Sequence, residues 1–463
     1  MSEGRFLTGS TMGHVVRMTA TGAFGITFVF LVDAANLFWI ARLGDPTLVA
    51  AIGFAFAIQF FSVSSGVGLM IAATAMVSRS IGAGQRQEAR VQAGAAMVMA
   101  VTFQAIVAML IVVFRHDLVA MAGATGETAR LAARYLAITI PSLLPMAIGL
   151  ICSGVLRADG HGARAMYITL ISGALLMSTD PVLIFWLGWG LDGAAIGLVA
   201  FRFALLVLGL WFAARQFDLI ALPDASSVRR VLPVYVAVAL PAVATQMATP
   251  VGNYLLTMVI APFGDDAVAA WAVVGRLTVV AFGGIFALAA SIGGIFGQNF
   301  GAGQYDRLRS TYRDALIFCA LYTLTAWALL FAATPLVIDW FDLAGQGAVV
   351  LRAFTHAGVG AFLFLGALFV SNAAFNALGR PLRSTALNWI KEGVVTLPVA
   401  LLLAGLVGAP GVIYGQALAG VLVGTFAAVW GWRFVCGLRD VPTVVLDAAP
   451  IRPYANPDRY RRR

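Results

Sequence analysis

The sequence predicts an all-α membrane protein in which twelve transmembrane helices form two parallel six-helix repeats. Three observations predict this fold. First, 61% of the 463 residues are hydrophobic and only 11% are charged, which excludes a water-soluble globule with an ordinary surface. Second, the arginines gather at alternate ends of the apolar segments. Third, landmarks of the first half recur in the second half at one spacing.

Twelve apolar stretches reach the roughly 20 residues that a helix needs to cross a bilayer. They begin near residues 16, 47, 91, 129, 163, 192, 230, 266, 312, 348, 383 and 410. The segment before the first stretch lacks the basic start, short apolar core and cleavage site of a signal peptide, so we expect the first helix to be retained. The three cysteines, Cys152, Cys319 and Cys436, suggest neither a disulfide framework nor a metal site.

Arginines orient these helices in the membrane. The even-numbered connections hold Arg79, Arg86, Arg90, Arg157, Arg164, Arg215, Arg229, Arg230, Arg307, Arg309, Arg313, Arg380 and Arg383. The odd-numbered connections hold only Arg42, Arg115, Arg130, Arg134 and Arg352. Because basic residues favour the cytoplasmic side, we expect a multi-pass protein of the inner (plasma) membrane with both termini in the cytoplasm.

The repeat is the strongest pattern in the sequence. SIGAGQRQEAR at residues 80–90 recurs as NFGAGQYDRLR at residues 299–309. LRADG, RLGDPTLVAAIG and GWGLDGAAIG also have counterparts in the second half, each at the same spacing to within one position. Each copy holds an even number of crossings, so both copies enter the membrane from the same side and are related by an axis along the membrane normal.

These repeats define the expected domains. Residues 1–219 form an N-terminal lobe with helices one to six, and residues 220–438 form a C-terminal lobe with helices seven to twelve. Residues 439–463 form a basic cytoplasmic tail that we expect to be disordered. The repeated GAGQ could suggest a phosphate-binding loop, but it lacks a third glycine and a preceding strand. A helix end followed by a tight turn is the better interpretation.

Three ionisable residues of the first lobe lie deep in apolar helices. Asp33 stands about 12 Å from the outer end of the first helix, at 1.5 Å per residue. Asp180 in the fifth helix and Arg202 in the sixth fall at a similar depth. A charge at a helix centre costs about 2.5 to 3.5 kcal/mol on insertion scales, so these residues are candidates for a functional site.

The second repeat serves as an internal control for this cluster. At the repeat spacing, Asp33 falls near Gly252 and Asn253, and Arg202 falls on Gly420. None of these is charged, so the cluster belongs to the first lobe alone. The alternative is that Asp180 and Arg202 form a buried pair that only fixes helix packing.

The arrangement of motifs resembles the multidrug and toxic compound extrusion (MATE) family of cation-coupled antiporters. The motifs are the first-helix VD, SRSIGAGQ with its counterpart GQNFGAGQ, and the succession LRADG, TDP and GLDGAA. The resemblance spans essentially the whole chain. It implies two six-helix lobes that alternate between outward and inward openings and export cationic or amphipathic organic compounds in exchange for protons or sodium ions.

The resemblance is closer to the DinF-like branch, in which acids matching Asp33 and Asp180 bind the coupling ion. That branch often has tyrosine and asparagine where this chain has Val29 and Leu176. The NorM-like branch uses a seventh-helix glutamate that is missing here. Few oxygen ligands favour protons over sodium ions. We expect Arg202 to pair with Asp180 and leave Asp33 to carry the proton, although the reverse assignment is open.

Further candidates lie outside this cluster. Lys391, the only lysine, precedes Glu392 in the eleventh helix, and neighbouring helical side chains point about 100° apart, so we expect them not to pair. They either pair elsewhere by snorkelling, or Glu392 attracts cationic substrate. The residues expected to line the substrate path are Gln59, Phe60, Phe61, Asn253, Tyr254, Asn372, Asn376 and Glu392.

The sequence therefore predicts a secondary antiporter for small organic molecules, surrounded by membrane lipids and acting as a monomer. It predicts no cofactor other than the coupling ion (H⁺, alternatively Na⁺), no metal site and no nucleic-acid partner. A flippase for a lipid-linked precursor, from the same superfamily, is the alternative within transport. An intramembrane enzyme would need a catalytic constellation at cavity depth, and three of the four histidines lie at or near helix ends, so we expect no enzyme.

Overall fold

The structure is a computed structural model that describes residues 4–341 and 343–438. All regular secondary structure in these residues is helical, and they contain no β-strand. The predicted all-α fold class is therefore confirmed. The tail at residues 439–463, which we expected to be disordered, lies outside the described residues.

The first half of the chain forms six helical spans; a short 3₁₀ segment interrupts one of them, two others end in short π segments, and all three segments are labelled η. The elements of this half are α1 (Thr11–Ala41), α2 (Pro46–Gly82), α3 (Arg86–Val113), α4 (Arg115–Met121), α5 (Gly126–Thr139), η1 (Ile140–Ser142), α6 (Leu143–Ala158), α7 (Gly162–Pro181), η2 (Val182–Trp186), α8 (Gly190–Leu210) and η3 (Trp211–Gln216). Helix α4 is a short helix between the third and fourth spans.

The second half repeats this order. Its elements are α9 (Ala225–Ile260), η4 (Ala261–Phe263), α10 (Asp265–Gly301), α11 (Tyr305–Trp340), α12 (Gly345–His356), η5 (Gly358–Ala361), α13 (Phe362–Ala377), α14 (Pro381–Trp389), η6 (Ile390–Thr396), α15 (Leu397–Val407) and α16 (Pro410–Gly437). Both halves break their fourth span with a 3₁₀ turn, η1 and η5.

Twelve helical spans of the described residues are long and apolar enough to cross a membrane, as predicted. They contain 25 to 39 residues. At 1.5 Å per residue even the shortest exceeds a hydrocarbon core of about 30 Å. The observed spans begin at or before the predicted positions because they continue beyond their apolar parts.

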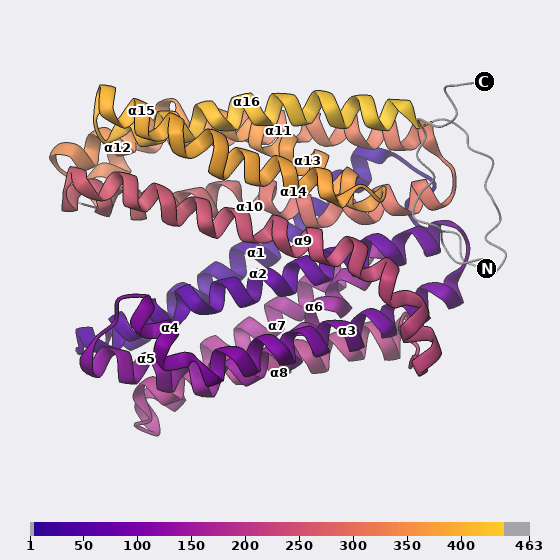
Figure 1. Cartoon of the computed structure of the whole chain (residues 1–463), viewed down its shortest axis with the longest axis horizontal. Coiled ribbons are helices and arrows are strands. Elements are labelled where there is room, and N and C mark those ends of the chain that lie inside the picture. The colour runs from indigo at the N-terminus through magenta and orange to yellow at the C-terminus, as the bar shows by residue number, and fades with distance from the viewer. Residues whose placement is uncertain (1–3, 342, 439–463) are drawn as a thin grey trace.

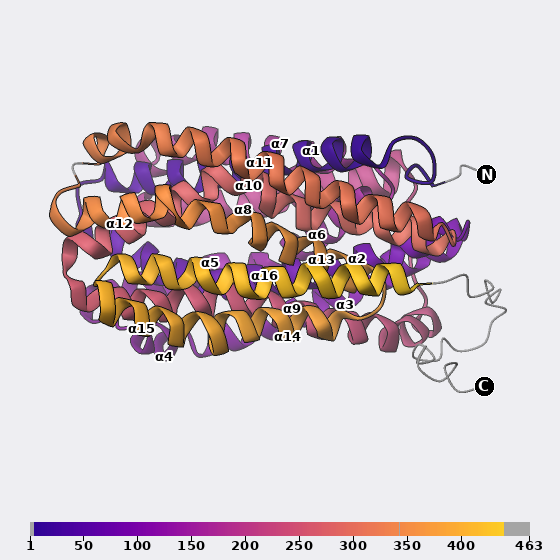
Figure 2. The same ribbon diagram turned by 90° about the horizontal axis from the view of Figure 1, so that it is seen from above.

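The two halves form separate bundles whose cores interlock. In Figure 1 most of the first half lies below the second, and Figure 2 shows the long helices running along the length of the molecule. One buried core extends from Ile40 to Ala239, and another joins Phe6, Val15 and Met18 to residues 256–435. The first part of α1 thus packs into the second core, and the first part of α9 packs into the first core.

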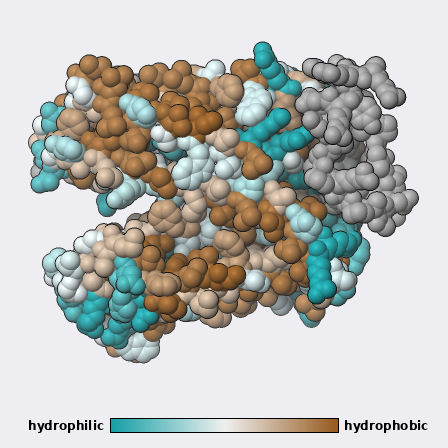
Figure 3. All heavy atoms as spheres, viewed as in Figure 1, coloured by the Kyte–Doolittle hydropathy of each residue, from teal (hydrophilic) through white to brown (hydrophobic). Residues whose placement is uncertain are grey.

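The halves separate at one end of the molecule and meet at the other. Figure 3 shows a cleft between them at the end where α4 and α12 lie in Figure 1. We call this the open end. The opposite end, where α2, α6 and α10 finish, is called the closed end.

Glycines allow α2 and α10 to touch at the closed end. A Cβ atom on Gly82 would collide with the carbonyl oxygen of Gln298, and one on Gly301 would collide with the carbonyl oxygen of Arg79. The repeat that aligns the two GAGQ motifs places Gly82 on Gly301 and Arg79 on Gln298, so it relates the two contacts. The pseudo-twofold axis passes through this crossing.

The GAGQ motifs end these two helices, as the sequence predicted. Gly84 and Gly303 have φ angles of 75° and 71°, the left-handed conformation that glycine adopts without strain. The N–H of Gln85 donates to the carbonyl of Ser80 at 2.9 Å, and that of Gln304 donates to Asn299 at 2.8 Å. These bonds cap the helix ends. The first glycine of each motif, Gly82 or Gly301, belongs to the helix crossing.

Candidate functional site

Asp33 projects from α1 with an exposed side chain. Its carboxylate forms no hydrogen bond or ion pair with any other described residue. Arg202 of α8 carries the opposite charge that acts on it, and it does so electrostatically, without contact. Asp33 is therefore an acid deep in a membrane helix with no fixed hydrogen-bond donor.

Asp180, near the end of α7, is 1% exposed and only half satisfied. Its Oδ2 accepts a hydrogen bond from Asn36 Nδ2 of α1 at 2.7 Å. Its Oδ1 is buried without a partner and lies against Gly197 of α8, where an added Cβ would collide with it. Asn36 is one helical turn after Asp33, so α1 brings the two acids to one region.

The structure corrects the expected ion pair between Arg202 and Asp180. Arg202 is 3% exposed and donates through Nη1 to the carbonyl of Thr139 at 2.8 Å and to Ser142 Oγ at 3.0 Å. Its Nη2 donates to Gln59 Oε1 at 2.7 Å. The guanidinium is thus held by neutral acceptors, while Asp180 bonds with Asn36 instead.

The break at η1 explains these partners of Arg202. Within η1 the amide of Leu143 turns to the carbonyls of Ile140 and Pro141, and Ser142 Oγ donates to the carbonyl of Thr139 at 2.6 Å. The carbonyl of Thr139 is consequently open to a buried cation. Pro141 is a local signal for the break, because proline has no N–H to donate. No pattern in the sequence indicates that Arg202 reaches it.

Sequence reasoning missed four residues of the first-lobe cluster. They are Asn36, Thr139, Ser142 and Tyr135, whose ring is 4% exposed and which interacts electrostatically with Asp33, Asp180 and Arg202. Asn36 follows Asp33 in the VDAAN stretch and could have been found by its spacing of one helical turn.

The residues predicted to line the substrate path divide by exposure. Phe60, Phe61, Asn253 and Tyr254 are exposed, whereas Gln59, Asn372, Asn376 and Glu392 are buried. Gln59 serves as a partner of Arg202, and its Nε2 also donates to Thr139 Oγ1 at 3.0 Å. The side-chain oxygens of Asn372 and Asn376 have no hydrogen-bond partner among the described residues.

Lys391 and Glu392 pair with each other, so the expectation that they point apart is wrong. Lys391 Nζ lies 2.6 Å from Glu392 Oε1, and both residues are buried. They lie in η6, a π-helical segment, in which neighbouring side chains do not keep the angular spacing of an α-helix. Two long side chains on such a segment can converge.

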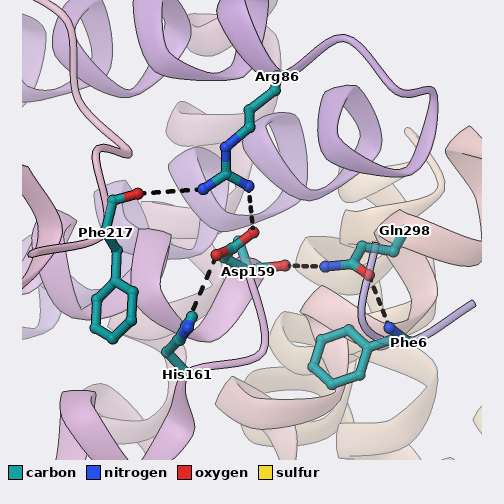
Figure 4. Close-up of polar contacts among 7 residues, drawn as sticks. Phe6, Arg86, Asp159, His161, Phe217 and Gln298 are labelled. Carbon is teal, nitrogen blue, oxygen red and sulfur yellow. Dashed lines mark hydrogen bonds and ion pairs between the residues drawn. The ribbon is translucent and has the colours of Figure 1, made fainter. Parts of the chain in front are cut away.

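A polar network joins the two halves at the closed end (Figure 4). Gln298 of α10 donates through Nε2 to the carbonyl of Ala158 at 2.6 Å, and its Oε1 accepts from the backbone N–H of Phe6 at 3.0 Å. Next to Ala158, Asp159 Oδ1 lies 3.3 Å from Arg86 Nη1. One glutamine therefore connects the end of α6, the end of α10 and the segment before α1.

His161 lies beside Asp159 in this network, and its ring nitrogens form no hydrogen bond with the described residues. Its ring centroid lies 3.7 Å from that of Phe217, and its Nδ1 lies 3.7 Å from Asp159 Oδ2. Burial, together with the charges of Arg5, Arg164, Arg86 and Arg17, lowers the pKa of His161 to about 4. Burial raises the pKa of Asp159, against the effect of Arg86 and Arg5.

The family model MatE matches the chain at residues 23–182 and again at residues 241–402. The two matches cover well over half of the chain. The chain belongs to the MatE family. Both matches have nearly the same length, and the spacing between their starts agrees with the internal repeat. Membership makes the chain a transporter rather than an enzyme, as predicted.

Curated relatives of this MatE protein are transporters. The FAD transporter of Shewanella oneidensis is 25% identical over 436 residues, which cover 92% of this chain and 95% of the relative. The multidrug export protein MepA of Staphylococcus aureus is 22% identical over 413 residues, which cover 88% of this chain and 90% of MepA.

Solved MATE structures share the fold. A mutant of the Vibrio cholerae MATE transporter VcmN matches with a TM-score of 0.86 and 24% identity over 92% of this chain and 96% of that one. A multidrug resistance MATE transporter of the MOP superfamily, in an outward-facing conformation, matches with a TM-score of 0.87 and 21% identity over 94% and 98%. At these identities the structures support the fold alone.

Proposed function

We propose that this MatE protein is a secondary antiporter that exports cationic or amphipathic organic compounds in exchange for protons. The observation that carries the proposal is Asp33, an acid in a membrane helix without a hydrogen-bond donor among the described residues. Such a group is stable in an apolar environment when it is protonated and must find water or a cation when it is ionised. Whether Asp33 binds or releases its proton therefore depends on which side of the membrane the space around it opens to.

Asp180 and Arg202 complete the proposed coupling site. Asp180 has one oxygen bonded to Asn36 and one without a partner, so it can accept a second proton. Arg202 stays charged and supplies a fixed positive charge near Asp33 that neutral partners hold in place. Its charge offsets one carboxylate, so the site is closest to neutrality with one proton bound.

Protons fit this site better than sodium ions. A hard cation such as sodium prefers several oxygen ligands, and the positions of the two expected polar neighbours hold Val29 and Leu176. Within the described residues no three His, Cys, Asp or Glu side chains gather at one point. Sodium coupling is the alternative.

We further propose how access alternates. The arginine-rich connections lie at the closed end, so this end faces the cytoplasm with the chain termini, and the cleft of Figure 3 opens outward. The lobes at residues 1–219 and 220–438 would move as two bodies. Opening the cytoplasmic side then requires that Gln298 release Ala158 and that α2 and α10 part.

A second candidate substrate is a flavin dinucleotide, because a relative of similar length is named an FAD transporter. A dinucleotide offers phosphates to the arginines and an aromatic ring system to the exposed phenylalanines and tyrosine. The organic cation remains our first proposal, because the first-lobe cluster carries two acids and one arginine.

The test is transport in proteoliposomes that contain the full chain. Ethidium and FAD are offered separately, first with an imposed proton gradient and then with an imposed sodium gradient. We expect ethidium to accumulate against its gradient with protons alone. Accumulation of ethidium with a sodium gradient alone would show that sodium, not the proton, is the coupling ion. Accumulation of FAD but not ethidium would show that the substrate is a flavin dinucleotide and not an organic cation.

A further inference from the structure

The second lobe holds a buried ion pair that the proposed proton coupling does not use. Lys391 and Glu392 are 5% and 9% exposed, and their charges meet at 2.6 Å. Apart from the contact between His161 and Asp159, every other ion pair of the described residues has at least one well-exposed side chain. A buried pair stabilises a fold poorly, because apolar residues of the same size often do as well or better.

The pair is incompletely satisfied. Glu392 Oε1 accepts from Lys391, and Lys391 Nζ has no second acceptor among the described residues. Glu392 Oε2 has no donor there either and is not fully enclosed, so a ligand can reach it. Thr396, four residues later on η6, is 1% exposed, and its hydroxyl also lacks a partner. Buried charges that serve packing alone normally have their remaining hydrogen bonds filled. These open positions point to a polar ligand.

Gly252 makes room for the acid. A Cβ atom on Gly252 of α9 would collide with Glu392 Oε2, so Glu392 lies directly against the backbone of α9. The π-helical segment η6 widens the eleventh span at the same level. Such segments often occur at functional sites. The surroundings of Glu392 therefore combine a local bulge with the removal of a facing side chain.

The repeat places Glu392 opposite the first-lobe site. At the spacing that relates the two GAGQ motifs, Asp33 falls on Gly252 and Gly173 falls on Glu392. In the first lobe, a Cβ on Gly173 of α7 would lie 2.8 Å from Val32, next to Asp33 on α1. Each lobe thus crosses its first and fifth spans at one glycine, and the acid comes from the other span. The two acids occupy related positions.

We infer that Glu392 is a binding site for the ammonium group of an amphipathic amine, and that Lys391 occupies this site when no substrate is bound. The lysine ammonium is itself an alkylammonium with N–H donors, so its position shows which chemical group the carboxylate accepts. A protonated amine takes the place of Lys391 Nζ on Glu392, and the lysine withdraws along its flexible four-carbon chain. No covalent bond is made or broken.

The role of this site rests on the proposed export function, in which the protein binds a substrate as well as a coupling ion. It divides the tasks between the lobes. Asp33 and Asp180 hold the coupling protons, whereas Glu392 holds an ammonium group, either that of Lys391 or that of the substrate. An ammonium with N–H donors should bind better than a quaternary cation, since Glu392 accepts a short hydrogen bond.

The test is equilibrium binding to the purified full chain in detergent. The probe is dansylcadaverine, a fluorescent primary amine, and its matched control is the N-acetylated form, which has the same ring system and no charge. Glu392→Gln should weaken dansylcadaverine about tenfold or more, because the carboxylate is lost. Lys391→Met should strengthen it by about tenfold, because the internal competitor is removed. Neither variant should change acetylated-probe binding by more than about twofold.

Two further variants keep the result interpretable if a single variant is unstable. The double variant Lys391→Met with Glu392→Gln leaves no buried charge unpaired and should bind the amine as weakly as Glu392→Gln. Glu88→Gln removes an acid at the closed end, where Glu88 pairs with Arg230 at 3.0 Å. This variant should bind both probes with the affinity of the wild type. Thermal unfolding of each variant reports whether it is folded.

Equal effects on the charged and acetylated probes would overturn the inference, and so would weaker amine binding in Lys391→Met with normal folding. Binding needs no gradient, so it is independent of the coupling ion. If the amine binds as described but no probe is transported under a proton gradient, the proposed function is wrong and the inferred amine site stands. If transport occurs but Lys391→Met and Glu392→Gln bind the amine as the wild type does, the inferred amine site is wrong.

Discussion

At the scale of single residues, the first-lobe cluster shows how a fixed charge is maintained inside a membrane bundle. Arg202 has three neutral acceptors, namely the carbonyl of Thr139, Ser142 Oγ and Gln59 Oε1. Hydrogen bonds to a charged group contribute about 1.5 to 3 kcal/mol each, twice the value for neutral pairs. The carboxylates are consequently left without a direct counter-ion, which suits groups that must gain and lose a proton.

A double-mutant cycle tests the assignment of these partners. Arg202→Met and Gln59→Leu each remove one side of a buried hydrogen bond, so the two losses of stability should be coupled by roughly 0.5 to 3 kcal/mol. Arg202→Met combined with Asp180→Asn should give nearly additive losses, since the two side chains do not touch. Thermal unfolding in detergent measures both cycles. If Arg202 were coupled to Asp180 but not to Gln59, the ion pair between Arg202 and Asp180 that the sequence predicted would be correct.

At the scale of elements, breaks in the helices decide which residues meet. The 3₁₀ turn η1 opens the carbonyl of Thr139 to Arg202, and the π segment η6 brings Lys391 onto Glu392. The depth of a charge could be predicted from the sequence because each residue advances a helix by a fixed rise. Its partner could not, because Arg202 and Thr139 are far apart in the chain and their meeting depends on the packing of α5 against α8.

The crossing of α2 and α10 yields a prediction for the closed end. Gly301→Ala places a methyl group against the carbonyl of Arg79 and should destabilise this end by about 1 to 3 kcal/mol. Spin labels on the closed-end connections of the two lobes should then report longer distances by pulsed electron resonance. Gly293→Ala on the same helix meets no neighbour within 4 Å and serves as the control. Unchanged distances in Gly301→Ala would show that this contact does not hold the end shut.

His161 yields a prediction for pH. Its pKa is about 4 in the folded protein and 6.5 in an unfolded chain, so between these values only the unfolded state binds the proton. Stability is therefore lost as pH falls from 6.5 towards 4. The pKa of Asp159 is raised, so Asp159 changes stability with pH in the opposite direction to His161. Asp159 is present both in the wild type and in the variant His161→Phe, so it does not account for a difference between them. His161→Phe keeps a ring in contact with Phe217 and should lose less thermal stability between pH 7 and pH 5 than the wild type. Parallel losses would exclude His161 as the cause.

At the scale of the whole molecule, two similar six-helix halves share interlocked cores and meet at one end. The number of spans and the repeat could be predicted, because apolar length and glycine spacing are local properties of the chain. The interlocking could not, because it depends on the start of α1 packing into the second core and the start of α9 packing into the first. A joint of this kind lets the halves tilt about a shared seam, as alternating access requires.

The coupling itself is the central claim, and proton movement driven by substrate tests it most directly. Proteoliposomes with the full chain and a pH-sensitive dye inside are given an ethidium gradient and no imposed proton gradient. Wild-type protein should move protons against the ethidium flux, and Asp33→Asn at the same level should move none while it remains folded. Proton movement by Asp33→Asn equal to that of the wild type would contradict the account.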